Sequence, residues 1–321
     1  MSTSRSTGAS AATLGIWLGI VSAATSSISG PMARSLTDAG WTPAALTIAR
    51  ALGAGALMLV PAVVMMRGQW ELARHESGRI LLLGGVGVAG TSVCYYNAIT
   101  LLPISVALLI QYSAPVLVLG YTSVRRRRVP HRTTLTGVAL AMLGLVLVVG
   151  VGGSGDTDAT GLIWAACGSV CFATYFVASE AVSPDLPAVA VTAAALLVAG
   201  VTVGAVCLTG IIEATATTRA VELASWSMSW IWPLALLVVV ATVITYTASL
   251  VSVSILGARV SSFVLLSELA FAVLTAWALA GETPRWMQLV GGAVLVGGIV
   301  LVRLGDAEAQ HTGLLEPDPV E

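Results

Sequence analysis

The sequence predicts an all-α integral membrane protein with ten transmembrane helices arranged as two inverted five-helix repeats. Three observations predict this fold class. More than half of the residues are hydrophobic and only one in ten is charged, a balance foreign to soluble globular domains of this length. Apolar runs of about 20 residues, the length needed to cross a bilayer, follow one another along the chain. The apolar runs of the second half also repeat the pattern of the first.

Charged residues, prolines and Gly/Asp clusters bound the apolar runs and divide the chain into ten predicted helices. The helices cover residues 12–32, 43–66, 79–101, 104–123, 134–152, 160–181, 187–211, 231–252, 257–280 and 285–304. Loops are short except for a polar segment at 67–78 and an interfacial segment at 213–229. Trp226, Trp230 and Trp232 at the end of the second segment are typical of an aromatic belt at a membrane interface.

An internal repeat becomes visible when the sequence is shifted by 154 positions, which lays the fourth and fifth helices on the ninth and tenth. The superposed pairs are Pro130 with Pro284, Gly137 with Gly291, Gly144 with Gly298 and Val106 with Val260. Each half has an odd number of spans, so the second half enters the membrane in the opposite orientation. This pattern predicts a pseudo-two-fold axis in the membrane plane and a midplane cavity that either half can close.

The repeat and the arginines predict the organisation of the chain. It consists of a cytoplasmic N-terminal tail at 1–11, a first five-helix repeat at 12–152, an external linker at 153–159, a second five-helix repeat at 160–304 and an acidic cytoplasmic tail at 305–321. The chain contains no lysine, so arginine alone sets the positive-inside bias. With both termini cytoplasmic, only Arg34, Arg219 and Arg285 lie outside among the arginines of loops and tails. We therefore expect a multi-pass protein of the cytoplasmic cell membrane.

A run of arginines from Arg125 to Arg128 follows the fourth predicted helix. Such a basic cluster is compatible with binding nucleic acid or phosphoinositides. Its place in a short cytoplasmic loop between two spans favours a topology anchor instead. No nucleic-acid partner is therefore expected.

Two stretches resemble a known family. The stretch from Tyr95 to Val149, with YYNAITLLPISVALLIQYSAPVLVL, is similar to the first half of the EamA family of the drug/metabolite transporter (DMT) superfamily. The stretch from Tyr246 to Val302 resembles the second half more closely, with a mid-helix glutamate, a terminal Gly-Glu and a Gly-rich last helix. The resemblance implies a ten-helix carrier, typically an exporter. Two departures are Leu269 after Glu268, where the family often has proline, and arginines where the first half often ends in Gly-Glu.

The resemblance and the inverted repeat together predict a secondary active transporter that works by alternating access. We expect an exporter of small metabolites such as amino acids, or of drug-like amphipathic compounds, and not an enzyme. The expected partners are a small-molecule substrate and the lipid bilayer, and the sequence leaves proton coupling and a homodimer open. No cofactor or metal ion is expected.

Two other functions remain as alternatives. A non-transporting membrane scaffold or sensor is compatible with the same hydrophobic pattern. A membrane enzyme is suggested only by Gly152-Gly153-Ser154-Gly155, which resembles the GxSG of intramembrane serine proteases. A catalytic serine needs a base within hydrogen-bonding reach, and every histidine lies outside the predicted spans. The sequence also lacks HExxH and P-loop motifs.

Glu268 is predicted half way along the ninth helix, where an ionised side chain costs at least about 2.5 kcal/mol at the bilayer centre. Ser261 and Thr275, seven residues to either side, share its helical face. This stripe indicates a proton- or cation-coupling site, or a counter-charge for a cationic group of the substrate. The alternative is a structural glutamate that is hydrogen-bonded across helices.

Arg50 is predicted two turns inside the second helix. Three interpretations stay open: an ion pair with Glu268, binding of a substrate carboxylate by its planar guanidinium, and snorkelling to the outer interface.

The remaining candidates are polar or aromatic residues on helices that the repeat places beside the predicted cavity. They are Trp17, Tyr96, Asn97, Gln111, Tyr112, Trp164, Tyr175 and Tyr246. The small residues Ala107 and Ala114 share the helical face of Gln111 and leave room for a ligand beside its amide. Each residue alone is also explained by helix packing, so the prediction depends on their convergence.

Overall fold

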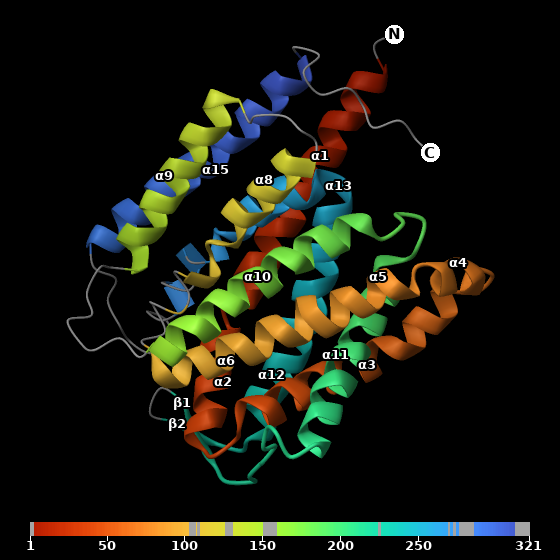
Figure 1. The fold of residues 1–321 in the computed structure, drawn as a ribbon, viewed down its shortest axis with the longest axis vertical. Helices are drawn as coiled ribbons and strands as arrows, with labels where there is room; N and C mark the ends of the chain where they lie inside the picture. Colours follow the sequence, from red (N-terminus) through yellow and green to blue (C-terminus); the bar gives the residue numbers. More distant parts are fainter. Residues whose placement is uncertain are drawn as a thin grey trace.

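The computed structural model shows a bundle of long helices that cross one another at varied angles (Figure 1). The structure describes residues 3–102, 107, 110–125, 131–149, 159–223, 226–268, 270–271, 274–275 and 286–311. Several sequence-based predictions lie outside these residues. They concern the linker at 153–158, the Gly152–Gly155 segment, the arginines at 126–128 and Arg285.

The first half contains most of the described helices in chain order. They are α1 (Thr3–Ser26), α2 (Ser29–Asp38), α3 (Pro43–Met65), α4 (Trp70–His75), α5 (Ser77–Leu82), the π-helical segment η1 (Leu83–Gly90), α6 (Thr91–Leu101), α8 (Ala114–Arg125) and α9 (Arg132–Val149). The second half follows with α10 (Ala159–Ala181), α11 (Ala188–Leu208), the strands β1 (Val221–Leu223) and β2 (Trp226–Met228), α12 (Ile231–Val238), the π-helical segment η2 (Val239–Ile244), α13 (Thr245–Leu265) and α15 (Trp286–His311).

Six helical stretches among the described residues are long and apolar enough to cross a membrane. They are Ala12–Asp38, Pro43–Met65, Ser77–Leu101, Ala159–Ala181, Ala188–Leu208 and Ile231–Leu265. The mostly α-helical fold with several membrane-spanning candidates agrees with the predicted class. The number of ten helices stays a prediction, because parts of the predicted fourth and ninth helices are not described.

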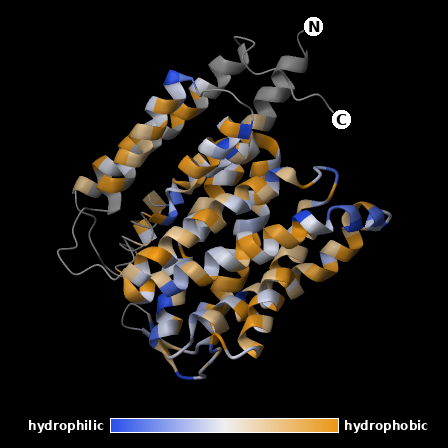
Figure 2. Ribbon diagram, in the orientation of Figure 1, coloured by the Kyte–Doolittle hydropathy of each residue, from blue (hydrophilic) through white to orange (hydrophobic). Residues whose placement is uncertain are grey.

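Large hydrophobic side chains lie on the outer surface of the bundle. On α3, for example, Leu57, Val60 and Val64 are 58%, 71% and 52% exposed. Figure 2 shows hydrophobic residues along most of the length of the long helices and hydrophilic residues at α4. Apolar surface that stays in water is less favourable than buried surface by about 25 cal/mol per Å², and contact with lipid tails avoids this cost. The outer surface therefore suits a bilayer.

Several predicted boundaries differ from the structure. Helix α1 begins at Thr3, within the predicted N-terminal tail, and α15 continues to His311, within the predicted acidic tail. The polar segment at 67–78 contains the short helix α4. Charged and polar residues extend a helix beyond the membrane-crossing length without a change in backbone periodicity, and hydropathy does not detect that extension.

The predicted interfacial segment at 213–229 contains an antiparallel hairpin, with Val221 opposite Met228. Val221 is fully buried in a cluster with Met32 and Leu36 of α2. The indole Nε1 of Trp41 donates a hydrogen bond to the carbonyl oxygen of Thr217 at 2.8 Å. These contacts bind the segment to α2 and to the start of α3, so tertiary packing orders what looks like a loop in the sequence.

Two membrane-spanning helices contain a π-helical segment. The segment η1 joins α5 to α6, and η2 joins α12 to α13. Gly84 and Gly87 of η1 lie where an added Cβ would come within 2.4 Å of the Ala195 carbonyl oxygen and 2.9 Å of the Tyr175 Cα. In η2, the Thr242 hydroxyl donates to the Leu237 carbonyl oxygen at 2.6 Å, five residues back. π-Helical turns are rare and occur often at functional sites.

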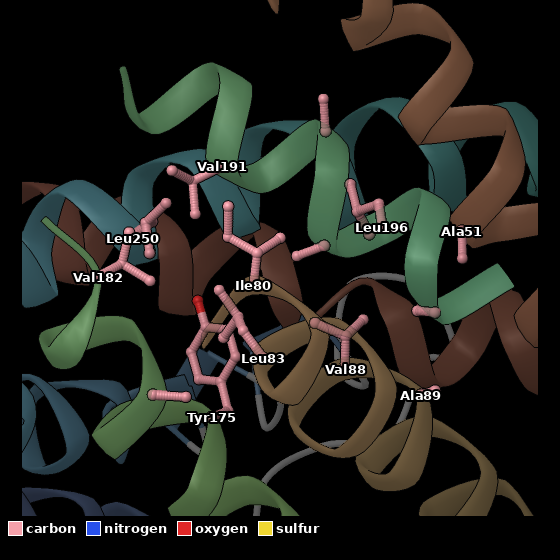
Figure 3. Packing of buried hydrophobic residues seen from close by; sticks show 14 of the residues in the cluster. Ala51, Ile80, Leu83, Val88, Ala89, Tyr175, Val182, Val191, Leu196 and Leu250 are labelled. Carbon is pink, nitrogen blue, oxygen red and sulfur yellow. The ribbon is translucent and has the colours of Figure 1, made fainter. Parts of the chain in front are cut away.

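The main hydrophobic core lies between α3, η1, α10 and α11. Figure 3 shows Leu83 and Val88 of η1 facing Leu196 of α11, with Tyr175 of α10 beside them. The fifth predicted helices of the two halves, α9 and α15, pack side by side along their length (Figure 1).

A kink at Gly257 divides α13. The backbone there has φ 78° and ψ 162°, so the chain turns sharply between the predicted eighth and ninth helices without a loop. Only glycine adopts this backbone region without strain. An added Cβ would also lie 3.1 Å from Glu180 Oε1 of α10.

We therefore expect Gly257→Ala to destabilise the protein by about 1–3 kcal/mol, the usual cost of such a backbone conformation in a residue with a Cβ. The melting temperature in detergent would fall accordingly. The matched control is Gly204→Ala in α11, where nothing lies within 4 Å of an added Cβ and the helix tolerates alanine well. Equal melting temperatures for the two variants would contradict a strained kink.

Candidate functional site

Arg50 of α3 lies inside the bundle and not at an interface. Its side chain is buried, with the residue only 5% exposed. The predicted snorkelling to the outer interface is therefore wrong for this structure. The guanidinium Nη2 donates a hydrogen bond to the Ser92 hydroxyl of α6, which in turn donates to the Val88 carbonyl oxygen at 2.8 Å.

Two tyrosine rings flank the guanidinium of Arg50. Its Cζ lies 5.8 Å from the centre of the Tyr96 ring and 5.9 Å from the centre of the Tyr246 ring. The Tyr246 hydroxyl is also within hydrogen-bonding reach of Arg50. Cation–π contacts of this kind contribute about 0.5–2 kcal/mol each.

The positive charge of Arg50 has no acidic partner in the described part of the chain. Within that part, Arg34 pairs with Asp38, and Arg79 pairs with Glu76. The Arg50 Nε has no hydrogen-bond partner among the described residues. Removing an ion from water costs several kcal/mol, so tyrosines and one serine offset only part of this penalty. The arrangement leaves Arg50 able to accept an anion.

Glu268 lies in a helical turn shortly after α13 and contacts a different set of residues. The hydroxyls of Ser26 on α1 and Tyr112 before α8 are within hydrogen-bonding reach of its carboxylate. Tyr95 of α6 is close enough to interact with it electrostatically. Glu268 as a whole residue is half-buried. The predicted ion pair between Arg50 and Glu268 is absent from the described residues.

A row of aromatic rings extends between the surroundings of the two charges. Tyr246 contacts Tyr175 edge to face, with centroids 5.7 Å apart. Phe172 stacks on Tyr175 at 6.3 Å and meets Tyr112 edge to face at 5.9 Å. Helices α10 and α13 of the second half thereby join residues near Arg50 and Glu268 through one aromatic surface.

Ser261 and Thr275, predicted to share a face with Glu268, make different contacts. Ser261 is fully buried, and its Oγ lies 3.4 Å from Ser252 Oγ. The Thr275 hydroxyl donates to the Ser27 carbonyl oxygen at 3.5 Å. Glu268 and Thr275 therefore both face the end of α1, whereas Ser261 packs against the other part of α13.

Gln111, Asn97 and the two tryptophans lie outside the aromatic row. Gln111 is buried, and its Oε1 has no hydrogen-bond partner among the described residues. The Asn97 amide donates to the Val93 carbonyl oxygen of its own helix at 2.8 Å. Trp164 packs at the edge of a small cluster around Ala107. Gln111, Asn97 and Trp164 make no contact with Arg50 among the described residues.

Trp17 points away from the interior and is 61% exposed. Gly15 and Gly19, two residues to either side, approach α13 so closely that an added Cβ would lie 2.8 Å from Leu256 and 2.7 Å from Val264. Residues two positions apart lie on nearly opposite faces of a helix, so Trp17 is turned towards the lipid. It does not belong to the candidate site.

Sequence reasoning missed four residues of the two surroundings. They are Ser26, Ser92, Tyr95 and Phe172. Ser92 lies four residues before Tyr96 on the same helical face, and this spacing was a usable signal. Ser26 and Phe172 had no comparable signal in the sequence, because small hydroxyl residues and phenylalanines are common on packed membrane helices.

These features define a class: a polytopic α-helical membrane protein in which Arg50 and Glu268 lie within the bundle, each held by hydroxyl and aromatic groups. The EamA-like transporter family matches the chain twice, over residues 13–150 and 159–304. The protein belongs to this family. The resemblance is confirmed, and the chain is a multi-pass membrane transporter.

Curated relatives and a solved structure extend the comparison. The threonine/homoserine exporter RhtA of Escherichia coli strain K12 is 27% identical over 299 residues, which cover 90% of this chain and 91% of that protein. RhtA of Escherichia coli O157:H7 matches to the same extent. A protein of known crystal structure is 19% identical, with a TM-score of 0.67 over 93% of this chain and 97% of that one. At this identity the likeness concerns the fold alone.

Proposed function

We propose that the protein is a secondary carrier that exports small metabolites, such as amino acids or drug-like amphipathic compounds, across the cytoplasmic membrane. The observation that carries this proposal is the family match over nearly the whole chain. The threonine/homoserine exporter among its relatives supports both the direction of transport and a small polar substrate. Both termini would lie in the cytoplasm, as the arginine distribution predicts.

The proposed mechanism is alternating access between two inverted repeats, at 12–152 and 160–304, joined by an external linker. Three observations support it. The family matches each half separately. The π-helical segments lie in the third predicted helix of each half, and η2 begins 156 positions after η1, close to the shift of 154 that superposes the halves. The fifth helices, α9 and α15, pack against each other, as equivalent helices do when a two-fold axis passes between them.

Proton coupling through Glu268 is the second part of the mechanism. A carboxylate within the membrane that is held by hydroxyl groups can gain and lose a proton during the transport cycle. A homodimer is compatible with this mechanism but is not required by it, because one chain contains both repeats.

The test is transport by purified protein in liposomes. We expect counterflow or gradient-driven flux of at least one compound from a panel of amino acids, amines and cationic dyes. Protein-free liposomes give the background leak. A scaffold or sensor would give no flux above that background for any compound, and this result would contradict the carrier.

A further inference from the structure

We propose that Arg50 binds the carboxylate of the transported compound, so that the substrates are organic acids of the amino-acid type and not amines or cationic dyes. This inference rests on the proposed function, because it assumes that the chain carries a small molecule. It selects between the two substrate classes that the family membership leaves open.

The first argument is the unused hydrogen-bonding capacity of Arg50. A guanidinium has five N–H donors in a planar fork. Among the described residues, Arg50 Nη2 donates a hydrogen bond to the Ser92 hydroxyl, and the Tyr246 hydroxyl is within hydrogen-bonding reach of the guanidinium. The Nε atom has no hydrogen-bond partner there. A carboxylate accepts two parallel hydrogen bonds from such a fork.

The second argument is charge. The described residues in contact with the guanidinium are a serine and two tyrosines, and none of them is a carboxylate. Glu268 does not neutralise it, because its carboxylate is held by Ser26 and Tyr112 instead. A buried ion that lacks an opposite charge is costly, and an anionic ligand would remove that cost.

The third argument is position. Arg50 and Tyr96 belong to the first half of the chain, whereas Tyr246 and Tyr175 belong to the second. A ligand bound to the guanidinium beside these rings would contact both halves. Alternating access requires a site at the interface between the halves.

The fourth argument concerns the kind of anion. Inorganic phosphate and a carboxylate both match the guanidinium fork. The surroundings of Arg50, however, continue into the aromatic contacts of Tyr175 with Phe172 and Tyr246. Aromatic surface suits the carbon skeleton of an organic acid better than a fully hydrated inorganic ion.

The experiment is competition against amino-acid counterflow by the full-length protein in liposomes. The probes are L-threonine, L-leucine and L-phenylalanine, each compared with its amide and its amino alcohol, and inorganic phosphate. For the unmodified protein we expect an acid to compete at least about tenfold better than its amide, since charge-assisted pairs are much stronger than neutral ones.

The variants separate binding by Arg50 from a structural role. Arg50→Gln would lose the preference for the acid over its amide, and Arg50→Lys would keep part of it, because lysine retains the charge without the fork. Arg219→Gln, at an exposed arginine of the segment before β1, is the matched control and would keep the full preference. The acid-to-amide ratio is informative because a general loss of folded protein lowers both values together.

Three results would overturn the inference and leave the carrier intact: transport of amines or dyes with no competition from acids, competition by phosphate as strong as by the acid, or an unchanged acid-to-amide ratio in Arg50→Gln. If Arg50→Gln does not fold, the inference is tested by the acid-to-amide ratio in the unmodified protein and in Arg50→Lys. Absence of flux for every compound would instead contradict the proposed function itself.

Discussion

We expect Glu268→Gln to abolish flux driven by a pH gradient while the protein stays folded. Glutamine has nearly the same shape as glutamate and can still hydrogen-bond with Ser26 and Tyr112, but it cannot bind and release a proton. Counterflow of substrate at equal pH on both sides would continue, because it needs no net proton movement. The measurement is the initial rate of flux in liposomes with and without an imposed pH gradient.

Two further variants test this role of Glu268. Tyr112→Phe removes one hydroxyl near the carboxylate and would change the dependence of the rate on pH without abolishing it. Glu222→Gln changes an exposed glutamate of the hairpin and would leave the pH dependence as it is. If Glu268→Gln and the unmodified protein respond equally to the gradient, Glu268 has no part in coupling.

The second large effect is expected for Gly298→Val, which would separate α9 from α15. An added Cβ at Gly298 would lie 2.4 Å from the Ala141 backbone nitrogen and 2.7 Å from the Gly137 carbonyl oxygen. These are backbone atoms, so no side chain can rotate to make room. Overpacking costs about 1–3 kcal/mol even where side chains can adjust, and this position allows less adjustment. Loss of monodisperse protein, or a melting temperature several degrees lower, is the expected result.

Gly297 provides the matched control for this substitution. It is the neighbour of Gly298 in the same helix, it is exposed, and nothing lies within 4 Å of an added Cβ. Gly297→Val would therefore keep nearly the full melting temperature. Equal stability of the two valine variants would show that α9 and α15 do not approach as closely as described here.

Part of the candidate site could be predicted from the sequence. Arg50 and Glu268 stand out because ionisable side chains are rare in membrane-spanning runs, and the tyrosines were named as polar candidates. Their pairing could not be predicted. Arg50 contacts Ser92, Tyr96 and Tyr246, whereas Glu268 faces the end of α1. Contacts between helices depend on how the helices rotate about their axes, and helical periodicity gives only the relative directions within one helix.

The different positions of Trp17 and Tyr175 illustrate the same limit. Both are large aromatic residues within a predicted span, yet Trp17 faces the lipid and Tyr175 lies in the core. Trp17 faces the lipid because Gly15 and Gly19, on the opposite face of α1, pack closely against α13. The spacing of small residues can be recognised in the sequence, but the sequence does not show which helix packs against them.

The sequence by itself determined the membrane character, the approximate helix boundaries and the family of this protein, because these follow from the length, polarity and order of apolar runs. Only the tertiary structure decided the hairpin over α2, the π-helical turns in two spans, the kink at Gly257 and the neighbours of the two ionisable side chains. The physical reason is that a bilayer requires a certain length and hydrophobicity of each span separately, and both properties can be read from the local sequence. Hydrogen bonds and ring contacts between spans depend on residues far apart in sequence, and only packing brings those residues together.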